Sequence, residues 1–417
     1  MLKNGLKIIL LDCLTGLLIG LLISAYQLAI FYTYKFSYNL ISNKTNISLS
    51  TYFSGVLLFA IIQYLSLVFC KNIDGSGIPY IEKSFKENKK IDYKKGLLLT
   101  LVNSIGTTFS GFTFGSEGPS VSLSARLGTF INSILKKRDN DREKLASGIG
   151  FGCAFLSPIS GLVYSLEEFE QKVNLKLLVR GLFMTFSAYL VCYFLNKNYL
   201  ISISDFKMLS FEHLYLIFPI IIFSVLIGLL FEYLLLFFRY IFKKFSKNIF
   251  VKYRTFFFFL IVSLMTYFYF DLMYSGNNLI KNLQNYSLSS LILILFLRLI
   301  LTSFLGSTGA SGGLVLPIFT LGGIIGAIIT KLLNLYFGFP LTYLPIISLI
   351  SLFSLFSYIT KSPLTAFTLF TFTLFKFSNQ YLNIITLLPF ALILFYLPSY
   401  FLNELKLNNL YQKMATI

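Results

Sequence analysis

Stretches of about twenty mostly apolar residues recur along the whole chain, and this pattern limits the possible folds more than any other feature. Examples are residues 8–33, 51–70, 213–238, 255–273 and 381–402. A helix needs about 20 such residues to cross the hydrocarbon core of a bilayer. Backbone groups inside that core must be hydrogen-bonded within the protein. We therefore expect an all-α polytopic membrane protein.

Composition leaves no room for a separate soluble domain. Of the 417 residues, 56% are hydrophobic and only 12% are charged, which is too apolar for a soluble globular chain. The first apolar stretch follows Lys3 and Lys7, contains Asp12 and lacks a small-residue cleavage site. We interpret it as a retained first helix and not as a removed signal peptide.

The net charge of +18 comes from basic residues that cluster between the apolar stretches. By the positive-inside rule, such loops face the cytoplasm, together with both termini of the chain. We expect these loops to set the topology and to contact anionic lipid, and we expect no nucleic-acid partner. The clusters are Lys83, Lys86, Lys89, Lys90, Lys94 and Lys95, then Lys136, Lys137, Arg138, Arg142 and Lys144, and finally six basic residues within 239–254.

Histidine and cysteine are too sparse and too scattered for most enzyme chemistry. His213 is the only histidine, and the four cysteines stand alone, without CxxC spacing. A metal cluster or an intramembrane hydrolase that pairs a serine with a histidine therefore lacks the residues that it needs. We expect no enzyme activity, no metal and no cofactor.

Three glycine-rich segments end in a proline and are typical of loops that lead into helices. They are residues 75–79 (GSGIP), 115–119 (GSEGP) and 312–317 (GGLVLP). Non-helical backbone at membrane depth occurs where it lines a cavity, and broken helices in two halves of a transporter mark its binding site. The segments predict two repeat halves of one membrane domain, residues 1–205 and 206–417.

Helix N-termini suit an anion because their unpaired amides carry a partial positive charge. We expect donors from the amides of Leu314 and Val315, from the amides around Gly118, and from the hydroxyl of Ser76. The alternative for each motif alone is a close helix crossing, which small residues also favour in membranes.

Glu117 stands at the start of a predicted helix, in the position that an anion would take. The carboxylate and the anion should compete, and protonation of the carboxylate should vacate the site. A simple helix cap is the alternative. Glu167 and Glu168 end another apolar helix and are candidates for proton uptake, or are flanking charges paired with Lys172 or Lys176. Arg298 lies inside an apolar run and needs a carboxylate or carbonyl partner, and we expect a buried structural ion pair.

Taken together, the three motifs resemble those of the CLC family of chloride channels and chloride/proton antiporters. The resemblance runs from Gly75 to Tyr411 and includes residues 306–312 (GSTGASG) ahead of the third motif. It implies a CLC-type inverted repeat of tilted and broken transmembrane helices. It also implies a homodimer of the prokaryotic type, without cytoplasmic regulatory domains.

Position by position, the resemblance implies that Ser76 and Tyr411 donate hydroxyl groups to the central anion, with Tyr400 as the rival of Tyr411. Glu117 would be the external gate and Glu168 the internal proton-transfer glutamate. Two departures, Ser116 in place of a common arginine and Val315 in place of a common phenylalanine, put anion affinity in doubt more than mechanism.

We expect exchange of chloride for protons across a bacterial cytoplasmic membrane. The alternatives are a passive voltage- or proton-gated chloride channel and a fluoride/proton exporter, the latter disfavoured by Ser76. A purely structural membrane protein would not need Glu117 within its glycine motif.

Overall fold

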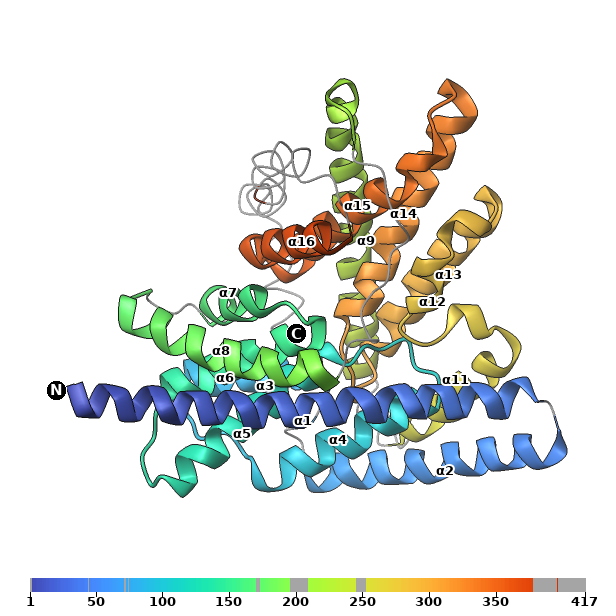
Figure 1. Cartoon of the computed structure of the whole chain (residues 1–417). Helices are drawn as coiled ribbons and strands as arrows, with labels where there is room; N and C mark the ends of the chain where they lie inside the picture. The colour runs from blue at the N-terminus through green and yellow to red at the C-terminus, as the bar shows by residue number, and fades with distance from the viewer. Residues whose placement is uncertain are drawn as a thin grey trace. The chain divides into compact units, whose positions relative to one another are not determined.

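The computed structural model is helical throughout the part of the chain that it describes, namely residues 2–43, 45–70, 73, 75–169, 173–195, 209–244, 253–377 and 396 (Figure 1). Within these ranges it contains fifteen α-helices and no β-strand. The predicted all-α fold class is confirmed. The predicted apolar stretch 381–402 falls almost entirely outside the described residues.

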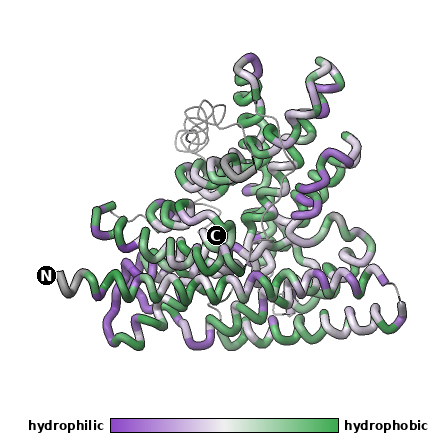
Figure 2. Tube along the Cα trace, in the orientation of Figure 1, coloured by the Kyte–Doolittle hydropathy of each residue, from purple (hydrophilic) through white to green (hydrophobic). Residues whose placement is uncertain are grey.

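Seven of the described helices are long and apolar enough to cross a membrane. The predicted stretches 8–33, 51–70 and 213–238 are confirmed as parts of such spans, and 255–273 corresponds to a shorter apolar helix, α11 (Arg254–Phe268). Figure 2 shows hydrophobic residues along most of the helices and hydrophilic ones gathered at helix ends and connections. The chain is a multi-pass membrane protein.

The described chain forms two compact units, and each is considered by itself. Unit 1 comprises Met1–Leu200, Lys252–Phe270 and Thr308–Leu314. Besides α11, its helices are α1 (Leu2–Ser42), α2 (Asn46–Phe69), α3 (Ile78–Lys86), α4 (Lys94–Phe109), α5 (Glu117–Ile134), α6 (Asn140–Phe155), α7 (Pro158–Glu168) and α8 (Leu175–Leu195).

Unit 2 comprises Ile201–Val251, Asp271–Ser307 and Val315–Ile417. Its α-helices are α9 (Ile217–Lys244), α12 (Asn277–Lys281), α13 (Leu288–Leu305), α14 (Val315–Phe337), α15 (Leu344–Thr360) and α16 (Pro363–Phe377). Unit 1 therefore contains segments from both predicted halves of the sequence, 1–205 and 206–417. The boundary of the two repeat halves at residue 205 stays a prediction.

Unit 1 is built around α1, which packs along α8 and against α2, α4, α5 and α6 (Figure 1). Small residues bring neighbouring helices close together. At the crossing of α6 and α7, a Cβ added to Gly152 would lie 2.8 Å from the Cα of Gly161. Close backbone approach of this kind replaces the hydrophobic driving force that helices lack inside lipid.

In unit 2, α14 packs mainly on α15, and both helices are largely buried. Arg298 of α13 is fully buried and donates from Nη2 to the backbone carbonyl of Tyr274 at 2.8 Å. Among the described residues this carbonyl takes the place of the carboxylate that we expected, so the predicted ion pair is not found there.

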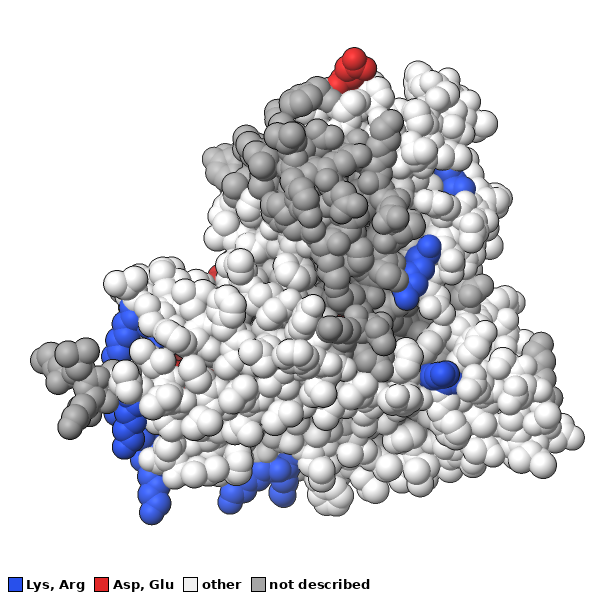
Figure 3. All heavy atoms as spheres, viewed as in Figure 1, with Lys and Arg blue, Asp and Glu red and all other residues white. Residues whose placement is uncertain are grey.

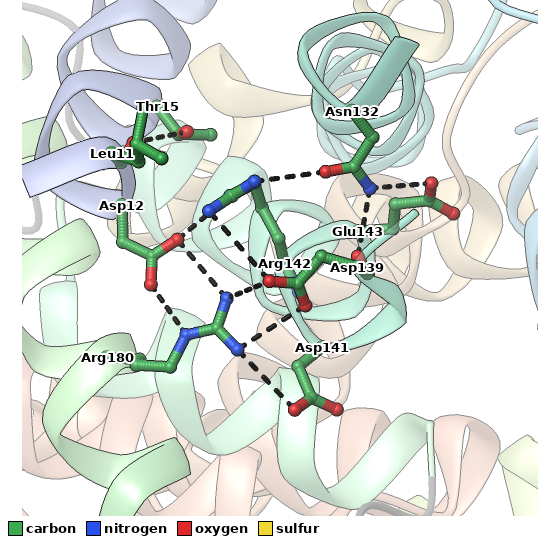
Figure 4. Close-up of polar contacts among 9 residues, drawn as sticks. All are labelled: Leu11, Asp12, Thr15, Asn132, Asp139, Asp141, Arg142, Glu143 and Arg180. Carbon is green, nitrogen blue, oxygen red and sulfur yellow. Dashed lines mark hydrogen bonds and ion pairs between the residues drawn. The ribbon is translucent and has the colours of Figure 1, made fainter. Parts of the chain in front are cut away.

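A buried network of charged side chains ties α1 to α6 and α8 (Figure 4). Asp12 is fully buried and accepts from two guanidinium groups, that of Arg142 at 2.9 Å and that of Arg180 at 2.6 Å. Arg180 also pairs with Asp139 at 2.7 Å. Asp139 caps α6 by accepting the amide of Arg142 at 3.1 Å.

The charges in this network depend on one another. Burial raises the pKa of Asp139, but the adjacent Arg180 and Arg142 guanidinium groups act more strongly in sum and hold that pKa below its usual range. The structure also corrects the interpretation of Arg142 as a topology-setting loop charge. Only 3% of this residue is exposed, and its guanidinium group forms an ion pair with Asp12 inside the protein.

We expect Asp12→Asn to destabilise unit 1. Loss of one partner from a buried ion pair costs about 3–5 kcal/mol, because the opposite charges stay buried without full compensation. The four cysteines are free and three of them are buried, so a thiol-reactive dye can follow thermal unfolding. Glu87→Gln is the control, since Glu87 pairs with Lys89 at the exposed surface, where such pairs contribute little to stability. Equal melting of the two variants would contradict a stabilising role for the network.

Candidate anion-binding site

The three predicted loop-to-helix motifs are confirmed. The segment 75–79 leads into α3, which begins at Ile78 with Pro79 in its first turn. The segment 115–119 leads into α5, which begins at Glu117. The segment 312–317 leads into α14, which begins at Val315. Residues up to Leu314 belong to unit 1, whereas Val315 opens a helix of unit 2.

Backbone hydrogen bonds join these three loops within unit 1. Gly115 and Gly313 exchange two bonds, each of 2.8 Å, in an isolated antiparallel bridge. The Gly75 amide donates to the carbonyl of Gly309 at 3.2 Å, and the amide of Gly312 donates back to Gly75 at 3.1 Å. Segments that lie far apart in the sequence are thereby held in one fixed register.

Glycine is required where the loops meet. A Cβ added to Gly118 would lie 2.7 Å from the Cβ of Ser76 and 3.0 Å from the Cα of Gly313. A Cβ on Gly313 would lie 2.7 Å from the amide nitrogen of Gly118. These contacts are with backbone or a short side chain, which cannot move aside as a long flexible side chain would. The structure therefore brings Ser76, Gly118 and the segment before Leu314 together.

The junction presents hydrogen-bond donors without a full positive charge. The Ser76 hydroxyl oxygen accepts from the Ile78 amide at 3.3 Å, which leaves its own proton available to a ligand. The first amides of α5 add the positive end of an 18-residue helix. Donors of this kind can hold an anion loosely enough for it to leave.

Glu117 is the first residue of α5 and only 2% exposed. The Ser116 hydroxyl lies 3.5 Å from Oε1 of Glu117 and accepts from the Gln27 side-chain amide at 2.9 Å. Gln27 belongs to α1, so this contact fixes the start of α5 against the first helix. A carboxylate at this helix N-terminus occupies a position that favours negative charge.

Glu168 is the last residue of α7, a helix that packs on α6 and α8. Its side chain is partly exposed and lies within electrostatic range of Tyr164. Glu167 is also partly exposed. The predicted partner Lys172 lies outside the described residues.

The other sequence-based expectations concern two tyrosines, the histidine and a metal site. Tyr411 and its rival Tyr400 both lie outside the described residues. His213 packs against the rings of Phe339 and Tyr343 in unit 2. No group of three or more His, Cys, Asp or Glu side chains suited to a metal occurs among the described residues.

Gln27 was not predicted as the partner of Ser116. A signal was present, because an amide side chain inside the apolar stretch 8–33 is unusual at membrane depth and marks a polar contact. The contact of Thr107 on α4, whose hydroxyl donates to the carbonyl of Ser311 at 2.7 Å, was not predicted either. No local pattern marks a contact between residues so far apart in the sequence.

Fold and site define a polytopic helical membrane protein in which three bonded glycine-rich loops each lead into a helix. Residues 55–393 match the protein family described as Voltage gated chloride channel. Because this match spans most of the chain, the protein belongs to that family, the CLC family.

Similar bacterial proteins carry the name H(+)/Cl(-) exchange transporter ClcA. The protein of Vibrio parahaemolyticus serotype O3:K6 is 23% identical over 335 residues, which is 77% of this chain and 72% of that relative. The protein of Vibrio cholerae serotype O1 is 24% identical over 345 residues, with 78% and 72% covered. These relatives are transporters and not enzymes.

Solved structures confirm the fold. A slow cyanobacterial Cl-/H+ antiporter matches with a TM-score of 0.82 at 19% identity, and 98% of each chain is covered. A CLC-type fluoride/proton antiporter matches with a TM-score of 0.74 at 19% identity, and 94% of each chain is covered. At this level of identity the likeness concerns the fold alone.

We expect Gly313→Ala to weaken chloride binding by at least about tenfold, because the new methyl group forces apart the backbones of residues 313 and 118. Isothermal titration of purified protein with chloride measures the effect. Gly323→Ala is the matched control, since its nearest neighbours are side-chain atoms at 3.5 and 3.8 Å, an ordinary contact distance. Unchanged chloride affinity in folded Gly313→Ala would show that the bridge does not shape the site.

Proposed function

We propose that this protein exchanges chloride for protons across the membrane. The observation that carries the proposal is the buried Glu117 at the N-terminus of α5, beside a cradle of backbone and hydroxyl donors. Membership of the CLC family and the names of the bacterial relatives support the same activity.

The central anion would be held by donors from three loops. Ser76 contributes its hydroxyl group, and Gly118 and Leu314 contribute backbone amides within unit 1. For Val315 as an amide donor and Tyr411 as a hydroxyl donor, the roles stay those that the resemblance to the CLC family implies. Helix N-termini stabilise the anion through partial charges and do not bind it as tightly as a lysine or arginine would.

Glu117 would couple the anion to the proton by competition. When ionised, its carboxylate satisfies the amides at the start of α5 and repels chloride. Protonation removes that charge, so the carboxyl group can leave and chloride can enter. Each entry of chloride from this side then requires one bound proton, which is released when the carboxylate returns.

Glu168 would supply the proton from the opposite side of the membrane. Its partly exposed position at the end of α7 allows exchange with water. A passive channel would not need this second carboxyl group. The presence of Glu168 therefore favours exchange over passive conduction.

We propose that the basic loops face the cytoplasm of a bacterium and contact anionic lipid headgroups. On the face in Figure 3, Lys and Arg side chains gather at the end of unit 1 beside the N-terminus. Exposed Lys136, Lys137 and Arg138 belong to one of these loops. The positive-inside rule supports a cytoplasmic N-terminus. We also propose a cytoplasmic C-terminus, and a homodimeric assembly on the resemblance to the CLC family alone.

Proton movement into liposomes under an outward chloride gradient tests the proposal. We expect the unaltered protein to move protons uphill. Glu168→Gln should still carry chloride but move no protons, because its side chain cannot exchange a proton. Glu117→Gln should also lose coupling, since a neutral amide stands in for the protonated gate at every pH.

Glu87→Gln controls for the loss of any carboxylate, because Glu87 lies on the surface in a pair with Lys89, and it should couple normally. If the unaltered protein moves chloride and never moves protons, the protein is a passive channel. If fluoride drives protons and chloride does not, it is a fluoride exporter.

A further inference from the structure

Arg126 is a fully buried arginine in the middle of α5, the helix that begins with Glu117. The motifs in the sequence do not include it, and the proposed transport cycle does not use it. A buried guanidinium keeps its charge and must be surrounded by acceptors. Its position on the helix of the gate raises the question of what that charge does.

The contacts of Arg126 hold its guanidinium against α3 and α4. Nε donates to the Ser122 hydroxyl at 3.2 Å, Nη1 donates to the backbone carbonyl of Asp92, and the Tyr80 ring lies 5.2 Å from the guanidinium carbon. The absence of a side chain at Gly96 of α4 makes room for Nη1. Three neighbouring elements thus fix the charge in place.

A short chain of contacts leads from this charge to the anion cradle. The Ser122 hydroxyl, which accepts from Arg126, lies 2.6 Å from where a Cβ of Gly77 would be. Gly77 has φ of +75° and forms the N-cap of α3, directly after Ser76. At the start of α5, a Cβ added to Gly118 would lie 2.7 Å from the Cβ of Ser76. Arg126 therefore stands behind the loop that holds Ser76.

We propose that Arg126 is a positioning residue that sets the affinity for chloride, by supplying a fixed positive charge behind the Ser76 loop. This inference rests on the proposed function. The charge attracts the anion into the cradle from a distance, whereas the amides and hydroxyl groups make the contacts. A positive charge in direct contact would hold chloride too tightly for turnover.

Helix geometry gives the size of the effect. Gly118 and Arg126 are eight residues apart on α5, which corresponds to about 12 Å along the axis. With an effective dielectric constant of about 20, a unit charge at about 12 Å changes anion affinity about tenfold. Such an effect is large enough to measure and small enough to permit release.

The carboxylate of Asp92 provides a test with the opposite sign. It lies within electrostatic range of Arg126 and opposes its field. Its backbone amide donates to the Tyr80 hydroxyl at 2.9 Å, and its side chain is partly exposed. Removal of the Asp92 charge should therefore strengthen the field of Arg126 at the cradle.

The experiment is isothermal titration of the purified full-length protein with chloride. We expect Arg126→Met to weaken binding about tenfold, Arg126→Lys to stay within about threefold of the unaltered protein, and Asp92→Asn to bind about twofold more tightly. Arg138→Met is the matched control, since Arg138 is an exposed arginine bound to the carbonyls of Asn88 and Lys89, and its affinity should be unchanged.

Unaltered affinity in folded Arg126→Met would overturn the inference. So would a lysine variant as weak as the methionine variant, because the effect would then come from packing and not from charge. If Arg126→Met does not fold, Asp92→Asn decides, and unchanged or weaker binding in that variant also overturns the inference. If the unaltered protein does not bind chloride, the proposed function is refuted instead.

Discussion

The reciprocal backbone bond between Gly115 and Gly313 is the contact on which the candidate site depends. It joins two segments almost 200 residues apart, and each segment leads directly into a helix. Because the bond is made by backbone groups, the loops can be held at fixed distance without any side chain that would fill the cradle. Glycine at position 313 follows from this arrangement, since a methyl group there would meet the amide of Gly118.

Charge in unit 1 is divided between two different tasks. Asp12 and Asp139 together neutralise Arg142 and Arg180 in a cluster that fastens α1 to α6 and α8 (Figure 4). Glu117, on the other hand, lies at a helix N-terminus beside a hydroxyl group, where partial charges stabilise its ionised form. In the proposed function, the first group holds the fold and Glu117 changes its protonation during transport.

The sequence was sufficient to predict the all-α membrane fold and to predict that the segments 75–79, 115–119 and 312–317 each lead into a helix. Both follow from local rules, namely the length of apolar stretches and the preference for glycine and proline at helix starts. These local rules did not predict contacts between residues that lie far apart in the sequence. Arg142 lies in a basic cluster and was interpreted as a loop charge, but its partner Asp12 is 130 residues away. The pairing of Gln27 with Ser116 escaped prediction for the same reason, because no local rule chooses among distant polar partners.

The roles of Ser76, Gly118, Leu314 and Val315 remain predictions that the loop geometry supports, and Tyr411 lies outside the described residues. The measurement that tests the central claim most directly is a crystal structure of the Glu117→Gln variant grown in bromide, with bromide located by anomalous scattering. The account predicts a bromide ion between the Ser76 hydroxyl and the amides of Gly118 and Leu314. Bromide found only at the basic surface loops, with the cradle empty, would contradict it.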